Sequence, residues 1–583
     1  MKKIFSVLIF LFIFEELFSQ VAQKVISLDK PSWHAVLGGN AIAPAEETRW
    51  GMAILTDGRM LNSCTADGKI IWRRGTKGKP TFITQRGDFF YLVTGEKRIT
   101  LVNSSGVELW NASAPFEITE KPVISNDGRI FVHGKNAIAC FGNKGIRKWY
   151  AKTPTLASLP TFVLSDGSAL VFTADEAFSG QTTAKRFSRY GEPLEDVIFS
   201  DVVDTAVQCS RGILVAMKDS SMGLISEEKG KVESPWIQKS YLSTSAFAIL
   251  PNEETGNVAF LFRSGGNTTA ILLRTHSGDF LNQFILPALD RTSISLSKTT
   301  YSGFFISDKK IAFEFAEDGT IWWQTALPPE KTWNQICYTK TNTIVLCMSD
   351  WVIRGYKTIS PPKAVAYQPF DEALEEPPKI KPSVRFSSPL SSSEGLELRA
   401  FSEAELKAAE RTLKKGDYGE KERAIVEGLR LETERYLNSQ TSSRAAQSYF
   451  AQNPEYTQRL LLLLSETGID DFSYYYAALI RAEKEPNTLA SLIKSAGKQG
   501  FDLDGEILTS FEYVYHASAF KENTAVLQNL CDATFEICRF MGRPALIRHG
   551  KDILKQLSAP PFPTRIREYA TKTLKRFAEE NAG

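Results

Sequence analysis

The chain has 583 residues, enough for two or more domains, and 43% of them are hydrophobic, so large cores can form. Its 69 Lys and Arg residues nearly balance its 67 Asp and Glu residues, which leaves a formal net charge of +2. Such a balance excludes a global electrostatic attraction to nucleic acid or to an anionic membrane.

The first residues predict an export signal. Two lysines precede an apolar run over residues 4–14, and two glutamates end it. A run of about eleven residues suits the centre of a signal peptide and is shorter than the ~20 residues of a membrane-spanning helix. With cleavage after Ser19, residues 1–19 form the signal peptide and the mature chain is periplasmic or secreted; an uncleaved anchor is the alternative. Because the first cysteine is Cys64, we expect no lipid-modified N-terminal cysteine.

Residues 24–360 predict a β-propeller, because a glycine turn followed by a bulky side chain occurs seven times. Successive glycines lie roughly 38–48 residues apart, which is the period of a four-stranded blade. The copies at Gly191, Gly230 and Gly278 are weaker than the others. The full set of seven glycines is Gly68, Gly106, Gly145, Gly191, Gly230, Gly278 and Gly319.

Residues 80–112 show the content of one repeat. They contain four short apolar stretches, at 80–84, 89–93, 99–102 and 107–110, separated by polar turns. Glycine suits such turns because tight hairpins often need a positive φ. A large ring on the outer strand can cover sheet faces that one blade cannot bury alone. We therefore predict that five tryptophans pack between blades rather than stack on a ligand: Trp72, Trp110, Trp149, Trp236 and Trp322.

The blade count depends on the two ends of this region. Residues 335–358 supply three strands, and the prolines that follow stop the pattern. Upstream, residues 25–36 form an unassigned stretch with its own tryptophan, Trp33. If this stretch provides the missing outer strand, the ring closes without an exposed sheet edge and has eight blades. Seven blades are the alternative, because the middle copies are degraded.

The glycine–tryptophan turns at this spacing resemble the PQQ-like repeat of quinoprotein alcohol dehydrogenases and of BamB-like proteins. The resemblance covers residues 30–360 and implies the fold rather than an activity. Members that use the quinone carry adjacent cysteines and a calcium ion held by Glu and Asn side chains, and this sequence has no Cys-Cys pair. We therefore expect no cofactor, no bound metal and no catalytic residue.

Motifs of other enzymes are also missing from the sequence, which has no G-x-S-x-G, phosphate-loop or H-E-x-x-H pattern. Residues 502–506 faintly resemble a calcium loop but lack its later acidic positions, so they predict a turn that leads into a helix. The histidines are isolated along the chain, and each is interpreted as a surface or packed residue: His34, His133, His276, His516 and His549.

The seven cysteines are an odd number for an exported protein. Cys337 and Cys347 flank a turn and could face each other across a hairpin as a disulfide; two small core side chains are the other interpretation. Cys531 and Cys538 lie seven residues apart on one predicted helix, too far apart to bond with each other.

Residues 361–397 predict a linker, because seven prolines, an acidic cluster and a serine run cannot form a core. Residues 398–583 predict helices joined by short turns, beginning with a capping box at Ser402 and Glu405. This pattern resembles HEAT or armadillo repeats in architecture, and an irregular bundle is the alternative. Further helices are expected near 419–438, 442–451, 454–466, 471–484, 487–498, 504–519, 522–541, 544–557 and 563–580.

Residues 539–576 are locally basic, with ten Lys and Arg against two acidic residues. This region predicts either the solvated outer faces of two helices or a docking patch for an acidic partner or phospholipid headgroups. Both modules are interaction architectures. We therefore expect a non-catalytic scaffold or adaptor of the cell envelope, with envelope or secreted proteins as partners and no nucleic acid. The alternative is a quinoprotein-like enzyme or a small-ligand sensor that uses the central funnel of the propeller.

Overall fold

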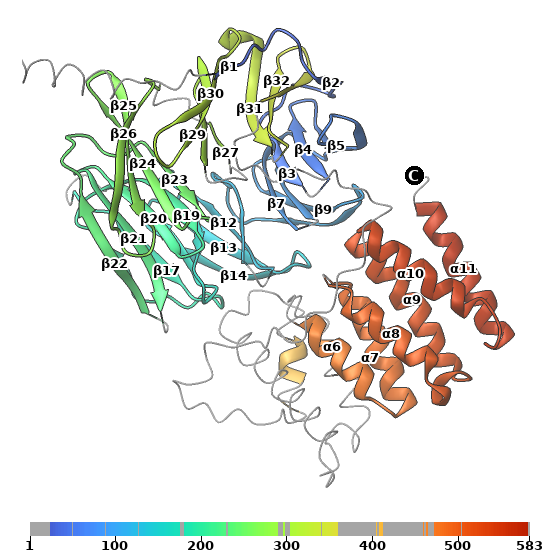
Figure 1. Cartoon of the computed structure of the whole chain (residues 1–583). Helices are drawn as coiled ribbons and strands as arrows, with labels where there is room; N and C mark the ends of the chain where they lie inside the picture. Colours follow the sequence, from blue (N-terminus) through green and yellow to red (C-terminus); the bar gives the residue numbers. More distant parts are fainter. Residues whose placement is uncertain are drawn as a thin grey trace, which may run out of the picture.

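The computed structural model describes residues 24–358 and 472–580, with short gaps, and a few residues between 404 and 463. The described residues form a β-propeller followed by a region of helices (Figure 1). The predicted signal peptide, the predicted linker over 361–397 and most of the helices predicted before residue 472 lie outside these residues.

The propeller consists of eight sheets with four antiparallel strands each, one of which gains a fifth, parallel strand, and this confirms the eight-bladed prediction over the seven-bladed alternative. Each blade is numbered by its order in the chain. Blade 1 contains β3 (Glu46–Thr48), β4 (Gly51–Thr56), β5 (Met60–Thr65) and β6 (Ile70–Gly75), and blade 2 contains β7 (Pro80–Arg86), β8 (Phe89–Thr94), β9 (Arg98–Asn103) and β10 (Glu108–Ser113). Blade 3 contains β11 (Val123–Ile124), β12 (Ile130–Gly134), β13 (Ala137–Phe141) and β14 (Arg147–Lys152). Blade 4 contains β15 (Phe162–Val163), β16 (Ala169–Phe172), β17 (Thr183–Phe187) and β18 (Val197–Ile198).

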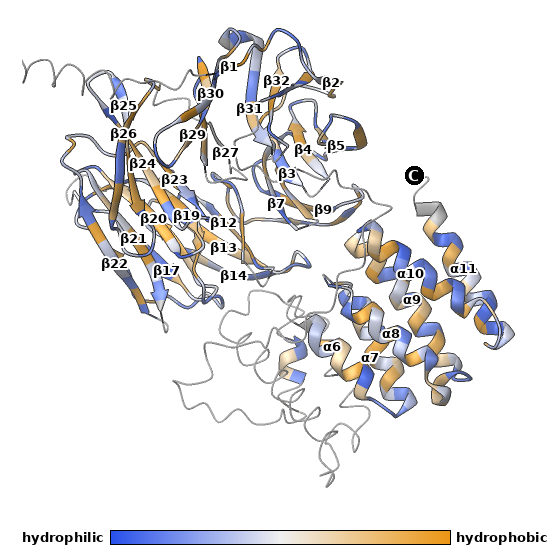
Figure 2. Ribbon diagram, in the orientation of Figure 1, coloured by the Kyte–Doolittle hydropathy of each residue, from blue (hydrophilic) through white to orange (hydrophobic). Residues whose placement is uncertain are grey.

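The remaining blades complete the ring, and hydrophobic stretches follow strands such as β4, β24 and β30 (Figure 2). Blade 5 contains β19 (Val203–Cys209), β20 (Gly212–Met217), β21 (Ser221–Glu228) and β22 (Lys231–Lys239), and blade 6 contains β23 (Ala248–Asn252), β24 (Asn257–Ser264), β25 (Asn267–Arg274) and β26 (Phe280–Leu286). Blade 7 contains β27 (Ser295–Ser297), β28 (Gly303–Ser307), β29 (Ile311–Ala316) and β30 (Ile321–Ala326). Blade 8 contains β31 (Trp333–Thr339), β32 (Thr343–Met348), β33 (Val352–Lys357) and, from the start of the chain, β2 (Trp33–Val36).

The N-terminal segment closes the ring as predicted and also contacts a second blade. Strand β2 pairs antiparallel with β33, with Trp33 opposite Gly355. Just before it, β1 (Lys24–Val25) adds a parallel fifth strand to β30 of blade 7. The Thr325 hydroxyl donates to the Ile26 carbonyl at 2.7 Å, which fixes the passage from one blade to the other. One short N-terminal segment therefore pairs with both blade 7 and blade 8.

The glycine turns and tryptophans form the joints between blades. The Trp72 ring of blade 1 lies against the turn of blade 2, where its indole N–H donates to the Ser104 carbonyl at 2.7 Å. Gly106 has φ +80°, and a Cβ there would lie 2.9 Å from the Trp72 ring, so glycine is needed for both backbone and space. The same ring-on-glycine contact joins Trp33 to Gly68, Trp110 to Gly145, Trp149 to Gly191, Trp236 to Gly278 and Phe284 to Gly319.

The joint after blade 7 differs from the prediction by one position. Trp322 reaches the edge of the core between blades 7 and 8, but the fully buried ring is Trp323. A bulge before the ring explains this, because the pairing of β30 with β29 skips Trp322, as the pairing of β6 with β5 skips Ile71 before Trp72. Trp323 is therefore the counterpart of Trp72.

The helices after residue 472 form three hairpins stacked in two layers, α6–α8–α10 and α7–α9–α11. Among the described helices, none is both long and apolar enough to cross a bilayer. These helices agree with the spans predicted after residue 471, and the assignment to HEAT or armadillo repeats stays a prediction. Their bounds are α6 (Phe472–Ala482), α7 (Pro486–Gln499), α8 (Glu506–His516), α9 (Thr524–Met541), α10 (Pro544–Leu557) and α11 (Thr564–Glu580).

Candidate interaction surface

One face of the propeller carries two hairpin turns from each of blades 1 to 7 and one from blade 8, whose fourth strand comes from the start of the chain. Antiparallel strands alternate in direction, so the turn between the first and second strands and the turn between the third and fourth strands lie at the same edge of the sheet. We call this side the turn face. In Figure 1 the helices lie beside the ends of β9 and β14, which border such turns in blades 2 and 3.

The end of α9 is bound by the turn of blade 2. The Asn103 side-chain amide donates to the Arg539 carbonyl at 2.9 Å, and the hydroxyls of Ser104 and Ser105 donate to the Gly542 carbonyl at 2.6 and 2.8 Å. A helix leaves its last carbonyls without partners in the helix, so these donors satisfy groups that otherwise need water. The propeller thus caps the C-terminus of α9.

The end of α7 is bound in the same way by the turn of blade 3. The Lys144 ammonium donates to the carbonyls of Lys498, at 3.1 Å, and Gln499. It also lies 4.3 Å from the centre of the Phe540 ring. A cation is favourable at a helix C-terminus because of the helix dipole. Loss of hydration and, to a smaller extent, the charges of Arg539 and Lys498 lower the pKa of Lys144 to about 7.

Three aromatic rings fill the space between these two polar contacts. Phe89, at the start of β8, stacks on Phe501 with ring centres 5.8 Å apart, and Phe540 lies 5.7 Å from Phe89. Gly542 makes the close approach feasible, since a Cβ there would lie 2.6 Å from the Asn103 side chain. We call the contact of these residues with the ends of α7 and α9 the domain seam. It joins the two domains into one continuous core cluster.

The segment of Asp502 leads into α8, as predicted, and its carboxylate points inward. Asp502 is fully buried, and its two oxygens accept from the backbone N–H groups of Ile507 and Leu508 at 3.1 and 3.0 Å. Burial raises the pKa of Asp502 to about 7, with the charges of Glu506 and Asp504 adding to the effect. Within the described ranges, no group of three or more His, Cys, Asp or Glu side chains is placed to hold a metal.

A hollow of about 690 Å³ opens on the turn face near the centre of the ring. It lies against the innermost strands of blades 3 to 5 and the first turn of blade 6. Its carboxylates are fixed by serines, since Ser165 donates to Glu227 and the backbone N–H of Ser210 donates to Glu253 at 2.8 Å. The other lining side chains include apolar and polar groups, among them Ile124, Leu164, Gln208 and Arg211.

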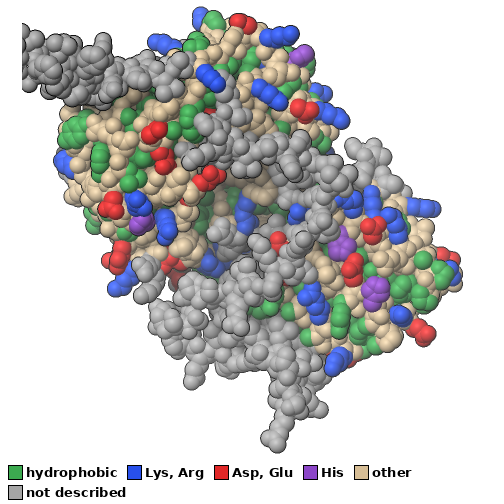
Figure 3. Space-filling model, in the orientation of Figure 1, with side chains coloured by type: hydrophobic (Ala, Val, Ile, Leu, Met, Phe, Trp, Pro, Cys, Tyr) green, Lys and Arg blue, Asp and Glu red, His purple; other side chains and the backbone are tan. Residues whose placement is uncertain are grey.

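The predicted basic region over residues 539–576 does not form one continuous patch. Arg539 pairs with Glu536 at 2.9 Å, and Arg576 contacts Asp532 and the Phe535 ring. Lys and Arg side chains are interspersed with Asp and Glu over the visible face of the helices (Figure 3). Much of this charge therefore serves contacts within the helical region.

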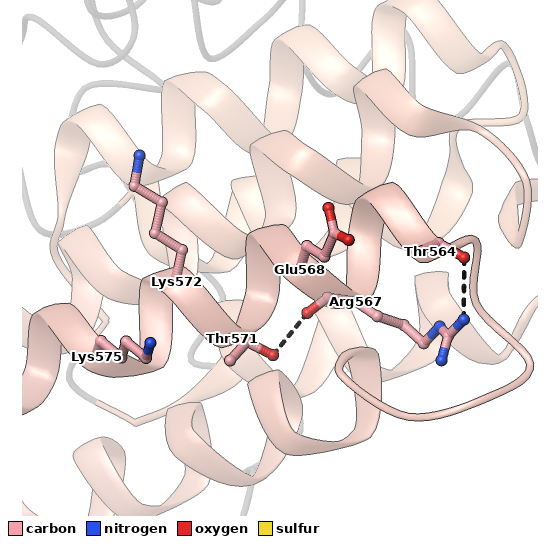
Figure 4. A pocket seen from close by; sticks show the side chains of 6 residues that line it. All are labelled: Thr564, Arg567, Glu568, Thr571, Lys572 and Lys575. Atoms are coloured by element: carbon pink, nitrogen blue, oxygen red, sulfur yellow. Dashed lines mark hydrogen bonds between the residues drawn. The ribbon is translucent and has the colours of Figure 1, made fainter.

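The outer face of α11 keeps the exposed part of that charge. It bears a shallow hollow of about 410 Å³ lined by residues of this one helix (Figure 4). Two dashed bonds lie within the helix, from Arg567 to Thr564 and from Thr571 to the Arg567 carbonyl. The last helix of a stacked array needs a polar outer face. The remaining lining residues are Glu568, Lys572 and Lys575.

The predicted histidines and cysteines lie apart from the seam, except for those of α9. His133 is buried and its Nδ1 lies 2.6 Å from the Thr161 hydroxyl, while burial lowers its pKa to about 4. Cys337 pairs with Val345 and not with Cys347, so the two cysteines do not face each other across the hairpin. All seven cysteines are buried free thiols, and the disulfide interpretation is wrong in this structure.

The seam residues carry no obvious signal in the sequence. Asn103 and the two serines after it look like ordinary turn residues, and Lys144 looks like a surface lysine. The signal that could find them is indirect: Gly500 and Gly542 end α7 and α9 in the left-handed conformation, and each helix end is followed or preceded by a phenylalanine. Helix ends flanked by large apolar residues favour a buried end, and a buried end needs donors from elsewhere.

Residues 58–189 match the family described as outer membrane protein assembly factor BamB. This range contains the three best glycine–tryptophan turns and both turns of the seam. No curated protein matches the sequence at a significant level.

Several solved propellers are similar in structure at low identity. BamB from Moraxella catarrhalis has 11% identity and a TM-score of 0.42, and the match covers 56% of this chain and 99% of that one. Sqt1 from Saccharomyces cerevisiae has 9% identity and a TM-score of 0.44, over 57% of this chain and 99% of that one. The C-terminal WD40 domain of Sif2 has 10% identity and a TM-score of 0.46, over 58% and 99%. These similarities do not bear on ligands or partners. Over residues 58–189, the chain is similar in sequence to the assembly factor BamB, and this is the family likeness that its residues carry.

Proposed function

We propose that this chain is a non-catalytic scaffold that binds other proteins of the cell envelope and serves their assembly or organisation. The matched family is named for assembly of outer membrane proteins, and it supplies the envelope role. A signal peptide over residues 1–19 would deliver the chain to the periplasm or the exterior. Proteins, and not nucleic acid, are the proposed partners, because the net charge is only +2.

The observation that carries the proposal is the domain seam. A propeller offers a rim of loops and a helical array offers an elongated surface, and either alone can bind proteins. Here the ends of α7 and α9 are bound to blades 2 and 3 by Lys144, Asn103, Ser104 and Ser105. Because helix ends and turns are fixed together, a partner meets the turn face and the helices in one orientation. This favours a scaffold with a composite binding surface.

Cross-linking in cells followed by mass spectrometry tests the proposal. The expected result is an envelope protein linked both to the turn face of blades 4 to 6 and to α10 or α11. A Lys144→Met, Ser104→Ala double variant should lose the paired links, because the seam loosens. Lys152→Met is the matched control on an exposed site of blade 3. Absence of any reproducible partner, or links unchanged by the seam variant, would contradict the proposal.

A small-ligand sensor is the second candidate, favoured by the hollow on the turn face. Its volume of about 690 Å³ lies within the usual range of ligand sites, about 300–1,000 Å³. Thermal stability of the purified protein with sugars, alcohols, calcium and a quinone would test it. A shift in Tm with one of these compounds that Gln208→Ala abolishes would favour the sensor. Reduction of a redox dye would favour a quinoprotein-like enzyme over both proposals.

A further inference from the structure

Three thiols gather at the joint where the ring closes. Cys64 lies on β5 of blade 1, and Cys337 and Cys347 lie on β31 and β32 of blade 8. All three belong to one apolar cluster, which also contains Met52 and packs against Trp33 of the closing segment. The other two propeller cysteines lie singly in other clusters, Cys140 and Cys209. The three thiols thus lie beside blade 8, the blade in which β2 and β33 pair without covalent continuity between them.

The electrostatics of the three groups agree with their proximity. Burial, with a smaller contribution from another thiol of the trio, raises the pKa of the Cys64 and Cys347 thiols to about 12. Burial likewise raises the pKa of Cys337, with smaller contributions from Cys347, Glu47 and Glu46. Their exposed fractions are 0%, 8% and 1% for Cys64, Cys337 and Cys347. In the closed ring these thiols are therefore slow nucleophiles that oxidants reach poorly.

We propose that this trio is an oxidation site at which Cys64 forms a disulfide with Cys337 or Cys347 and locks the ring. Such a bond joins two packed sheets, as inter-sheet disulfides do in other β proteins. The register of β31 and β32 places Cys337 opposite Val345, which disfavours a bond inside the hairpin. The third cysteine keeps its thiol and can exchange with the bond.

The chemistry requires an oxidant, which we take to be a small disulfide such as oxidised glutathione. A Cys64 thiolate attacks one sulfur of the reagent and releases the other as a thiol, which leaves a mixed disulfide. A thiolate of Cys337 or Cys347 then attacks the protein sulfur and releases the second reagent thiol. Two protein thiols lose two protons and two electrons, and the reagent gains both.

Opening of the joint controls the reaction, because the closed joint excludes the reagent. The closing strand is only four residues long, and Trp33 packs on the glycine turn of blade 1. Loss of the Trp33 ring should therefore expose the trio. The proposed export would place the protein where disulfides persist, and this part of the inference rests on the proposed function.

The experiment uses the purified full-length chain, so that it is independent of cellular location. After incubation with oxidised glutathione in urea below the unfolding midpoint, thiol titration of the denatured protein should fall from seven groups to five. Peptide mapping should show Cys64 in the bond, and Cys64→Ser should abolish it. Cys209→Ser is the matched control and should still lose two thiols.

A pair of tryptophan variants locates the site. Trp33→Ala should accelerate formation of the bond at least about tenfold, whereas Trp236→Ala should accelerate only modification of Cys209, which shares its cluster. The locked ring should shift its unfolding equilibrium roughly a hundredfold toward the folded state. Seven thiols that persist under these conditions, or a Cys337–Cys347 bond, would overturn the proposal. A bond that forms in vitro but is missing from protein recovered from cells would instead count against export.

Discussion

The joints between blades and the domain seam solve the same problem with different chemistry. A joint places an indole on a glycine turn, and most of its contact is apolar and repeated around the ring. The seam places hydroxyl, amide and ammonium donors on the ends of two helices, and among the residues that the structure describes it occurs once. Because the apolar joints repeat around the ring, we expect the blades to unfold together. Because only a few polar contacts hold the ends of the helices, we expect the helices to detach without unfolding the ring. The following changes test that difference, beginning with the largest expected effect.

Removal of one indole should damage the ring most. Trp110→Ala empties the space against Gly145 and removes the bond from the indole to the Asn143 carbonyl. Loss of a fully buried aromatic ring costs about 3–5 kcal/mol in free energy of unfolding, and the half-buried Trp110 ring should fall near the lower end of this range. Urea unfolding followed by far-UV circular dichroism would measure this loss of unfolding free energy. The control is Trp351→Ala, whose ring is 54% exposed and should cost little.

Addition of one methyl group on the other side of the same joint should cost slightly less. Gly145 has φ +76°, and a Cβ would lie 2.6 Å from the Trp110 ring. Backbone strain and overlap in Gly145→Ala should together cost about 2–4 kcal/mol. Gly95→Ala has φ +56° and no atom within 4 Å, so it should show the strain alone. In the Trp110→Ala background, the loss of unfolding free energy caused by Gly145→Ala should fall to that caused by Gly95→Ala. If Gly145→Ala costs the same in both backgrounds, the contact between Trp110 and Gly145 does not stabilise the ring.

The joint between blades 7 and 8 should depend on pH through Glu314. This residue is fully buried and accepts from Trp323 at 2.8 Å and from Tyr338 at 3.0 Å, and burial raises its pKa to about 7. Between the unfolded pKa and about pH 7 the folded ring keeps a proton that the unfolded chain loses. The free energy of unfolding should therefore fall as pH rises through this window.

Glu314→Gln cannot ionise and should remove this slope. At pH 8 the variant should be more stable than the wild type by up to about 3 kcal/mol, and near pH 4 the two should agree. Urea titrations at both values would measure the difference. Glu254→Gln, on an exposed turn of blade 6, should keep the wild-type slope. A parallel pH profile for Glu314→Gln and the wild type would show that Glu314 is ionised in the folded ring.

The seam should show the smallest effect on stability and the most local one. Ser104→Ala with Ser105→Ala leaves the Gly542 carbonyl without its two hydroxyl donors. The cost should be about 1–3 kcal/mol, confined to the attachment of the helices. Hydrogen exchange should increase near the ends of α7 and α9 and stay unchanged in the blades. Ser277→Ala, on the same face but away from the seam, is the control; faster exchange throughout the ring would contradict separable domains.

The same difference decides what the sequence could predict. The ring was predictable because Gly106 and Trp72 recur with a fixed spacing that reflects a repeated contact. The exact ring in blade 7 was not, because a bulge decides whether Trp322 or Trp323 faces the next blade. The Cys337 disulfide failed for a related reason, since the pairing register is set by tertiary packing.

The seam was not predictable because its donors have no pattern in sequence. Ser104 and Lys144 are common turn residues, and their partners are backbone carbonyls that any residue provides. The helices α6 to α11 could be placed from their periodicity and caps, but their contact with blades 2 and 3 joins residues more than 350 positions apart. Such a contact leaves no trace in local composition.

The position of the closing strand has a consequence for biosynthesis. Residues 24–36 leave the ribosome before every blade, yet their partners in β30 and β33 follow about 300 residues later. Blades 1 to 6 can form in order of synthesis, while the N-terminal segment must wait unpaired until the last strands exist. Completion of the ring is then a single late event with very high contact order, and slow folding of the whole propeller is expected. A chain truncated before residue 352 should remain an open, aggregation-prone arc with a free sheet edge.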